Sequence, residues 1–252
     1  MSLNNQTYYN YIDKKTIPIV FIHGVGLDHN MWSPQINYFK NYSTITYDLL
    51  GHGRTPFKKE KINMQDYIEQ LLSIIEFLKV EKINLVGFSI GSLIALNFAT
   101  DFQKKLNSLT LIATTYKRTE EQRQAVIDRV NLAKLNKPIS QLAMKRWFTD
   151  EYLKKNPIIY DKFTKILTKN GEDQKNFIKA YELFAHYKDD LEKIKKINTK
   201  TLVMTGSIDP GSTPEMSKKL SNDLNNSLYS EINNGKHLCS IECADDVNIN
   251  IK

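Results

Sequence analysis

The sequence predicts an α/β domain in which helices cover both faces of a mainly parallel, twisted sheet. Apolar strand-like runs alternate with amphipathic helix-like stretches over most of the chain. A serine flanked by glycines stands where one such strand gives way to a helix, and residues 115–195 show helical patterns only. The 252 residues are enough for one large core with an inserted helical lid.

The strands and helices of the core follow one another in a regular order. Residues 62–80 place apolar side chains three and four positions apart, which predicts one buried helix face. Residues 7–13 are expected to form an antiparallel lead-in strand, joined at residues 13–15. The other strands are expected over 16–24, 42–53, 82–88, 106–114, 199–206 and 227–234, with helices over 29–40, 62–80, from Ser92 onward, over 214–224 and at the C-terminal end.

Between the fifth and sixth core strands the alternation of strands and helices stops. Amphipathic helices are expected over 120–135, 139–148, 161–170 and 173–187, with no strand among them. The predicted organisation is therefore a core of residues 1–114 and 196–252 with a helical lid of residues 115–195.

The composition limits which binding partners and which cellular compartment we expect. The hydrophobic fraction of 41% and charged fraction of 25% are typical of soluble globular proteins. The net charge of +7 comes from scattered lysines without a basic, aromatic-interleaved stripe, which argues against nucleic acid and favours an anionic small-molecule substrate. No stretch is long enough to span a bilayer, and the first fifteen residues lack a signal-peptide core, so we expect a cytoplasmic protein without a membrane partner.

The two cysteines fit the same compartment. Cys239 and Cys243 form neither a disulfide framework nor a zinc pattern, so we expect free thiols in a reducing cytoplasm. No metal or cofactor is implied, and the chain has no phosphate-binding glycine loop of the P-loop or dinucleotide type. Monomer and homodimer both remain open.

In the motif "GFSIG", residues 87–91, a glycine stands two positions before Ser89 and another two positions after it. A sharp strand-to-helix turn forces its central residue into an unfavourable backbone conformation, and side chains two positions away would collide. In return the serine hydroxyl projects above the sheet, where the N–H groups of the following helix also point. Ser89 is therefore the predicted nucleophile.

Serine needs a base, and the base needs an orienting carboxylate. Among five histidines, only His237 follows the last predicted strand, at the sheet edge where Ser89 should also lie. Asp209 ends a strand in a glycine- and proline-rich turn, whereas Asp48 fits a turn-forming segment better. The predicted triad is Ser89, Asp209 and His237, in the chain order expected for this architecture.

Acyl transfer also needs N–H donors for the developing oxyanion, each worth about 3 kcal/mol. Ile90 follows the nucleophile directly, and Val25 lies in the glycine-containing loop after the first core strand. We expect the backbone N–H groups of these two residues to form the oxyanion hole.

Five segments carry a family resemblance: "HGVGLDHNMW", "YDLLGHGRT", "GFSIG", "GSID" and "GKH". In this order, over nearly the whole chain, they resemble the α/β-hydrolase superfamily. Within it, "MWSPQ", "DLLGHGRT", "RWFTDEYL" and "HLCSIE" look most like 3-oxoadipate enol-lactonases and neighbouring carboxylic-ester hydrolases. The resemblance implies a serine esterase or lactonase with a catalytic triad, an oxyanion hole and a cap domain.

The lid is expected to choose the substrate. Arg146 can pair with a substrate carboxylate and Trp147 can wall the acyl pocket, or Trp147 packs between lid helices while Arg146 is solvated; both interpretations stay open. Phe88 flanks the serine and is expected to line the pocket, whereas Trp32 is expected in the core.

Three functions remain at this point. The first is cleavage of a small carboxylic ester or (enol-)lactone through an acyl-enzyme. The second is hydrolysis of a C–C or C–N bond in a ring-fission product, for example an amidomethylene succinate, by the same triad. The third is a non-catalytic ligand receptor.

Overall fold

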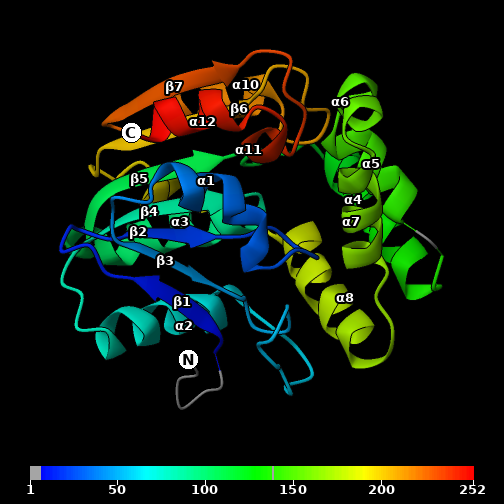
Figure 1. Ribbon diagram of the computed structural model, residues 1–252, viewed down its shortest axis with the longest axis horizontal. Helices are drawn as coiled ribbons and strands as arrows, with labels where there is room; N and C mark the ends of the chain where they lie inside the picture. The colour runs from blue at the N-terminus through cyan, green and yellow to red at the C-terminus, as the bar shows by residue number, and fades with distance from the viewer. Residues whose placement is uncertain (1–6, 138) are drawn as a thin grey trace.

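The parallel strands all point toward one end of the molecule in the computed structural model, which describes residues 7–137 and 139–252 (Figure 1). Seven strands form one sheet in the order β1-β3-β2-β4-β5-β6-β7. Every pair is parallel except β1 with β3. The strands are β1 (Tyr9–Ile12), β2 (Ile19–Ile22), β3 (Thr44–Tyr47), β4 (Ile83–Phe88), β5 (Leu106–Ile112), β6 (Thr201–Gly206) and β7 (Ser227–Ile232).

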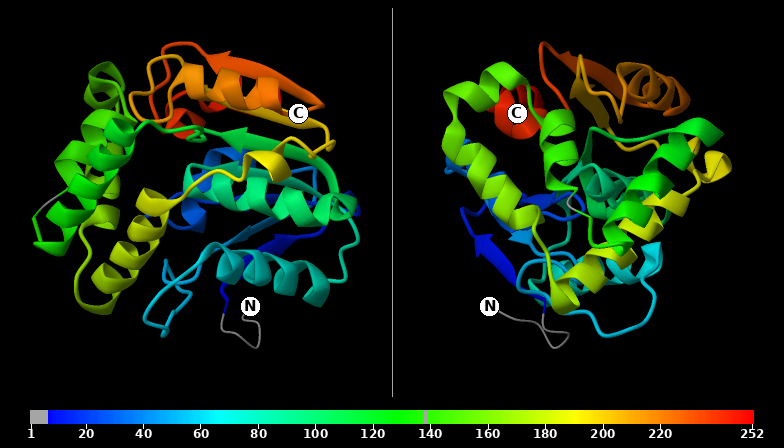
Figure 2. Two further views of the ribbon diagram at one scale, coloured as in Figure 1. Left: turned by 180° about the vertical axis from the view of Figure 1, so that it is seen from behind. Right: turned by 90° about the vertical axis from the view of Figure 1, so that its right-hand side faces the viewer.

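Helices cover both faces of this sheet, so the predicted fold class is confirmed (Figure 2). One face carries α2 (Met64–Phe77), α3 (Ile90–Phe102) and α10 (Pro214–Asp223). The other carries α1 (Ser33–Tyr38), α11 (Cys239–Glu242) and α12 (Ala244–Ile251). The helix expected from Ser92 starts earlier, at Ile90, directly after the serine.

The lead-in strand is antiparallel, as expected, but its partner is not the strand that follows it in the chain. Tyr9 pairs with Tyr47 and Ile12 with Thr44, so β1 lies beside β3 at the sheet edge. The preceding residues 1–6, on which part of the signal-peptide prediction rests, lie outside the described residues.

Between β5 and β6 the described chain forms helices and no strand. They are α4 (Glu120–Lys134), α5 (Ser140–Trp147), α6 (Asp150–Lys155), α7 (Pro157–Leu167), α8 (Gly171–His186) and α9 (Leu191–Ile194). Helices α4 to α8 stand at the end toward which the parallel strands point (Figure 1). The lid is therefore helical, and its exact division from the core stays a prediction.

Two short lid helices, α6 and α9, escaped the sequence analysis. The α6 helix begins where the Thr149 hydroxyl accepts the N–H of Tyr152, at 3.2 Å, and Pro157 then opens α7 four residues before the expected start. Proline fits the first turn of a helix but not its interior, so a short helix ends and a new one begins there.

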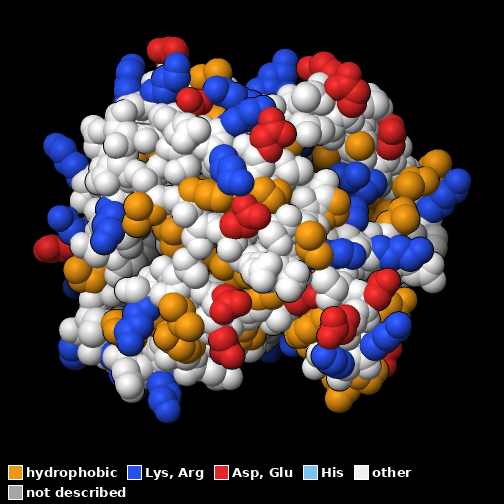
Figure 3. Space-filling model, turned by 90° about the horizontal axis from the view of Figure 1, so that it is seen from above, with side chains coloured by type: hydrophobic (Ala, Val, Ile, Leu, Met, Phe, Trp, Pro, Cys, Tyr) orange, Lys and Arg blue, Asp and Glu red, His pale blue; other side chains and the backbone are white. Residues whose placement is uncertain are grey.

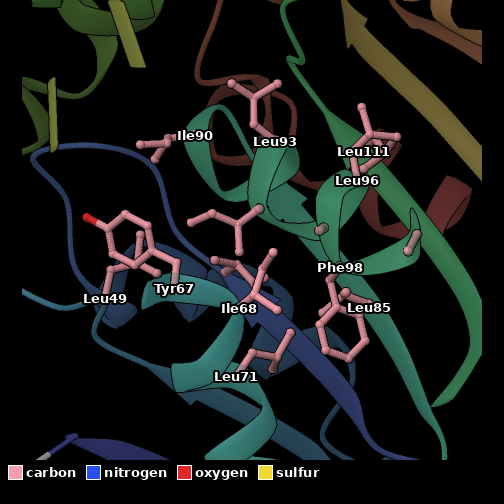
Figure 4. Packing of buried hydrophobic residues seen from close by; sticks show 14 of the residues in the cluster. Leu49, Tyr67, Ile68, Leu71, Leu85, Ile90, Leu93, Leu96, Phe98 and Leu111 are labelled. Atoms are coloured by element: carbon pink, nitrogen blue, oxygen red, sulfur yellow. The ribbon is translucent and has the colours of Figure 1, made fainter. Parts of the chain in front are cut away.

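The core lies between the sheet and its helices. Ile68 and Leu71 of α2 pack with Leu93 and Phe98 of α3 and with Leu85 of β4 (Figure 4). Each such side chain stabilises the fold by about 1.5–3 kcal/mol when fully buried. This layer fixes α3, and so the position of the serine at its N-terminus.

Charged side chains of both signs are spread over the face that Figure 3 shows, in line with the scattered lysines of the sequence. Within the described ranges, no helix combines the length and apolarity that a membrane crossing needs.

Candidate active site

Ser89 occupies a strained turn between β4 and α3. Its φ of 55° and ψ of −117° are unfavourable for an L-residue. A Cβ atom at Gly87 would stand 2.3 Å from the Gly91 carbonyl oxygen, and one at Gly91 would stand 2.4 Å from the Ile22 carbonyl oxygen. Both glycines are therefore required by close backbone approach, as the motif predicts.

The three residues of the predicted triad lie together. The Ser89 Oγ is 3.3 Å from the His237 Nε2, and the His237 Nδ1 is 2.7 Å from the Asp209 Oδ2. With a proton on Nδ1 donated to Asp209, Nε2 is free to accept the serine proton. Ser89 and His237 are each only 5% exposed, so the site is largely shielded from bulk water.

Asp209 is held as an anion by its surroundings. Its Oδ1 accepts the N–H groups of Gly211 at 2.8 Å and of Ser212 at 3.0 Å. Burial alone would raise the pKa of Asp209, but the charge and hydrogen bond of His237 and these two N–H groups hold it below its usual range. A carboxylate therefore faces His237 at neutral pH.

The loop that carries His237 is fixed by contacts that the sequence analysis missed. The Leu238 N–H donates to the Trp147 carbonyl at 3.0 Å, and the Lys236 N–H donates to the Glu242 Oε2 at 3.2 Å. The Glu242 Oε1 also accepts the N–H of Thr149 at 2.9 Å and its hydroxyl. Glu242 thus ties the lid to the histidine loop.

The predicted oxyanion donors are Ile90, next to the serine in the chain, and Val25, which lines the same cavity as the serine. Ile90 is the first residue of α3, so its N–H has no partner within the helix. Val25 lines the same cavity as Ser89, on the loop after β2. That loop is braced by His23, whose Nδ1 pairs with the Gly24 carbonyl at 2.8 Å and whose Nε2 accepts the Leu49 N–H at 2.9 Å. The oxyanion role of Val25 and Ile90 stays a prediction.

A second histidine–aspartate pair supports this region. The Asp48 Oδ1 accepts the His29 N–H at 2.9 Å and pairs with the His29 Nδ1 at 2.7 Å, while its Oδ2 accepts the Arg54 N–H at 2.8 Å. Burial would raise the pKa of Asp48, but these hydrogen bonds and the nearby His23 lower it overall. Asp48 thus holds its turn against the loop after β2, as a turn-forming residue should.

The same pair belongs to a group with the residue types of a metal site. Asp28, His29 and Asp48 place potential ligand atoms within 4.8 Å of one another. The two carboxylates already accept backbone N–H groups, Asp28 from Asn30 at 2.8 Å and Asp48 from His29 at 2.9 Å, and the His29 Nδ1 pairs with Asp48. The arrangement is explained by loop bracing.

A cavity of about 190 Å³ opens onto Ser89 and His237. Phe88, Arg146 and Trp147, all named from the sequence, line it. Trp147 lines the cavity and also packs edge-on against Phe163 of α7, with ring centroids 6.2 Å apart. Arg146, which one interpretation expected to be solvated, is half-buried at the cavity wall. Trp32 lies fully buried in the core, as expected.

Two further arginines, Arg118 and Arg129, line the cavity and were not found from the sequence. They stand on or just before α4 without any local motif, and only the folded lid brings them to the cavity. No aspartate or glutamate of the described chain lines it. Three arginines, counting Arg146, thus give the cavity wall positive charge.

The α/β hydrolase fold family model matches residues 17–243. The chain is 30% identical over 250 residues to the (E)-2-((N-methylformamido)methylene)succinate hydrolase of Acinetobacter baylyi, covering 97% of this chain and 92% of that protein. It is 29% identical over 226 residues to 3-oxoadipate enol-lactonase 1 of the same species, covering 89% and 83%.

The crystal structure of the enol-lactonase from Burkholderia xenovorans superimposes with a TM-score of 0.89 at 21% identity, over 100% of this chain and 97% of that one. A thermophilic esterase from Thermogutta terrifontis gives 0.86 at 22% identity, over 98% and 93%. At these identities the two structures show the shared fold.

The sequence relatives bear the names of hydrolases, which sets the receptor hypothesis aside. The match over most of its length, the parallel sheet and the serine at the strand-to-helix turn together show that the chain belongs to the α/β-hydrolase family and is a hydrolase.

Proposed function

We propose that the protein is a serine hydrolase that cleaves a small carboxylic ester or enol-lactone through an acyl-enzyme. The observation that carries this proposal is the chain of contacts from Ser89 through His237 to Asp209. The similarity to a 3-oxoadipate enol-lactonase supports the choice of substrate class.

The proposed reaction begins at the Ser89 hydroxyl. His237 removes its proton through Nε2 while Asp209 stabilises the imidazolium that forms, and the serine oxygen attacks the carbonyl carbon. The N–H groups of Val25 and Ile90 stabilise the oxyanion. His237 then protonates the leaving oxygen, and water attacks the acyl-enzyme in the same way to release the acid.

The cavity supports a small, negatively charged substrate. Its volume of about 190 Å³ is below the range usual for drug-sized ligands. Arg146 lies beside the Asp209 turn, 3.5 Å from where a Cβ on Gly211 would stand. This position near the Asp209 turn supports the proposal that Arg146 pairs with a substrate carboxylate.

The test compares wild type with Ser89→Ala on a panel of enol-lactones and short-chain aryl esters. We expect wild-type turnover and at least a 10³-fold loss of kcat/KM in Ser89→Ala. Labelling of wild type, but not of Ser89→Ala, by a fluorophosphonate probe supplies the control. Full turnover by Ser89→Ala on every substrate would refute the mechanism.

The alternative is cleavage of a C–N or C–C bond by the same triad. The observation that favours it is the 30% identity, over 97% of this chain, to a hydrolase named for a methylformamido-methylene succinate. Including amidomethylene succinates and vinylogous diketo acids in the same panel decides the matter. A kcat/KM for them at least 100-fold above that for lactones and esters would replace the first proposal.

A further inference from the structure

The lid end of the cavity contains a buried guanidinium that is only partly satisfied. Arg118 lines the cavity and is 8% exposed. Its Nη2 donates to the carbonyls of Phe184 at 2.7 Å and Tyr187 at 3.0 Å, and its Cζ lies 4.9 Å from the Phe184 ring centroid. Its Nη1 has no hydrogen-bond partner among residues 7–137 and 139–252. An orphaned, buried charged donor is costly and calls for an acceptor.

Thr115 lines the same cavity and carries a second buried group without a hydrogen-bond partner in the described part of the chain. It is 5% exposed, and its Oγ1 has no partner within the described part of the chain. It stands three residues before Arg118, in the segment that leads from β5 into α4. A hydroxyl and a guanidinium nitrogen, both buried and both unpaired, make a donor set for an anion.

The positive charge near Thr115 and Arg118 also favours an anion. Arg129 also lines the cavity and donates from Nε to the Tyr181 hydroxyl at 3.0 Å. Burial, together with the charges of Arg123 and Arg129, lowers the pKa of Arg118 to about 10, although Asp189 opposes this shift.

Asp189 offsets this positive charge only from a distance. Within the described ranges its carboxylate is not within 4.0 Å of a cationic nitrogen, and its Oδ2 accepts the Lys117 N–H at 2.8 Å. It does not line the cavity. The positive charge on the cavity wall is thus left without an acidic partner at the wall itself.

We propose that Thr115 and Arg118 form an anion-binding subsite that receives a substrate carboxylate remote from the scissile carbonyl. This subsite differs from Arg146, which lies beside the triad aspartate, whereas Arg118 contacts the C-terminal end of α8. The substrate class becomes an ester or lactone with a carboxylate at its far end. The inference rests on the proposed function for which bond reacts at Ser89.

Two matched esters test the subsite. One is the p-nitrophenyl monoester of glutaric acid, with a free carboxylate, and the other is its methyl-capped, neutral analogue. We expect wild type to favour the charged ester at least tenfold in kcat/KM. We expect Arg118→Met to reduce that preference tenfold or more, and Thr115→Val to reduce it two- to fivefold, because each removes a donor to the carboxylate.

Arg123→Met is the matched control. Arg123 lies on α4, five residues after Arg118, and also donates to the Tyr187 carbonyl, at 2.7 Å, but it does not line the cavity. The charged-to-neutral ratio should stay at the wild-type value in this variant. A ratio that falls equally in Arg123→Met and Arg118→Met would assign the effect to general charge and overturn the subsite.

The outcomes separate the subsite from the proposed function. If wild type turns over both esters with no preference, or Thr115→Val and a folded Arg118 variant keep the preference, the subsite is wrong and the hydrolase proposal stands. If Arg118→Met does not fold, Arg118→Lys and Thr115→Val decide by the same ratio. If wild type turns over neither ester, the ester proposal fails, and calorimetry with glutarate then tests the subsite alone. Glutarate binding that is weakened tenfold in Arg118→Lys or Thr115→Val supports the subsite. Unchanged glutarate binding overturns it.

Discussion

The carboxylate of Glu242 accepts the backbone N–H of Thr149 at 2.9 Å, and so joins the start of α6 to the segment after His237. Its other oxygen accepts the Lys236 N–H, next to the histidine itself. One side chain therefore fixes the lid and the histidine loop to each other. A carboxylate that accepts several N–H groups makes stronger hydrogen bonds than a neutral acceptor does.

Glu242→Gln is expected to lower kcat more than it raises KM. The amide keeps one acceptor oxygen but turns an NH₂ group toward the other N–H, so the loop loses about 1–3 kcal/mol of restraint. We expect a five- to fiftyfold fall in kcat on an ester substrate. Glu215→Gln is the control, since Glu215 forms only an exposed pair with Lys219 on one helix. An unchanged kcat in Glu242→Gln would mean that the other loop contacts suffice.

Gly206→Ala tests the close contact between the aspartate turn and the histidine loop. A Cβ at Gly206 would stand 2.1 Å from the Gly235 carbonyl oxygen, which real structures do not tolerate, so the two backbones must separate. We expect a loss of about 1–3 kcal/mol in the free energy of unfolding, measured with denaturant. In Gly211→Ala the nearest neighbour is 3.5 Å away, and the loss should stay below about 0.5 kcal/mol. Equal losses in the two variants would contradict this account.

The sequence predicted those parts of the site that depend on local backbone chemistry. Gly87, Ser89 and Gly91 form one turn, and Asp209 and His237 each follow a strand end, so topology alone places them at one edge. The fold class was also predictable, because the alternation of strands and helices is visible in local hydrophobic patterns.

Other features depend on contacts between distant segments. Thr149 and Glu242 are 93 residues apart, and no pattern in either segment marks their contact. The guanidinium of Arg118 is held by the carbonyls of Phe184 in α8 and Tyr187 just after it, which are 66 and 69 residues away in the chain. The sequence analysis did not predict the pairing of β1 with β3. A lead-in strand can pair with the strand that follows it or with a later one, and the sequence of the turn does not distinguish the two.

Asp48→Asn should make the stability of the fold less dependent on pH. The pKa of Asp48 is lowered in the folded protein, so its contribution is fully present above the unfolded value of about 3.9 and is lost as pH falls through the lower folded value. We expect the variant to be about 1–3 kcal/mol less stable at pH 7, because His29 and Arg54 lose a charged acceptor.

Denaturant unfolding at pH 7, 5, 4 and 3 provides the measurement for Asp48. The difference between wild type and Asp48→Asn should be constant from pH 7 to 5 and shrink below pH 4. Asp223→Asn, at a partly exposed pair with Lys117, provides a control with a smaller difference at pH 7. A difference for Asp48 that grows toward acid would show that its folded pKa is raised, contrary to the hydrogen bonds around it.

Ser89→Gly should be inactive yet more stable than Ser89→Ala. The φ of 55° and ψ of −117° at position 89 strain any side-chain-bearing residue by about 1–3 kcal/mol, and glycine removes that strain. Glycine also gains about 0.4–1 kcal/mol of freedom in the unfolded chain, so a net advantage of about 1 kcal/mol over alanine remains. Denaturant midpoints of the two inactive variants measure it, and both should retain the wild-type slope. Ser89→Gly falling below Ser89→Ala in stability would show that the turn is relaxed, and that the nucleophile is held in place by packing of its Cβ rather than against backbone strain.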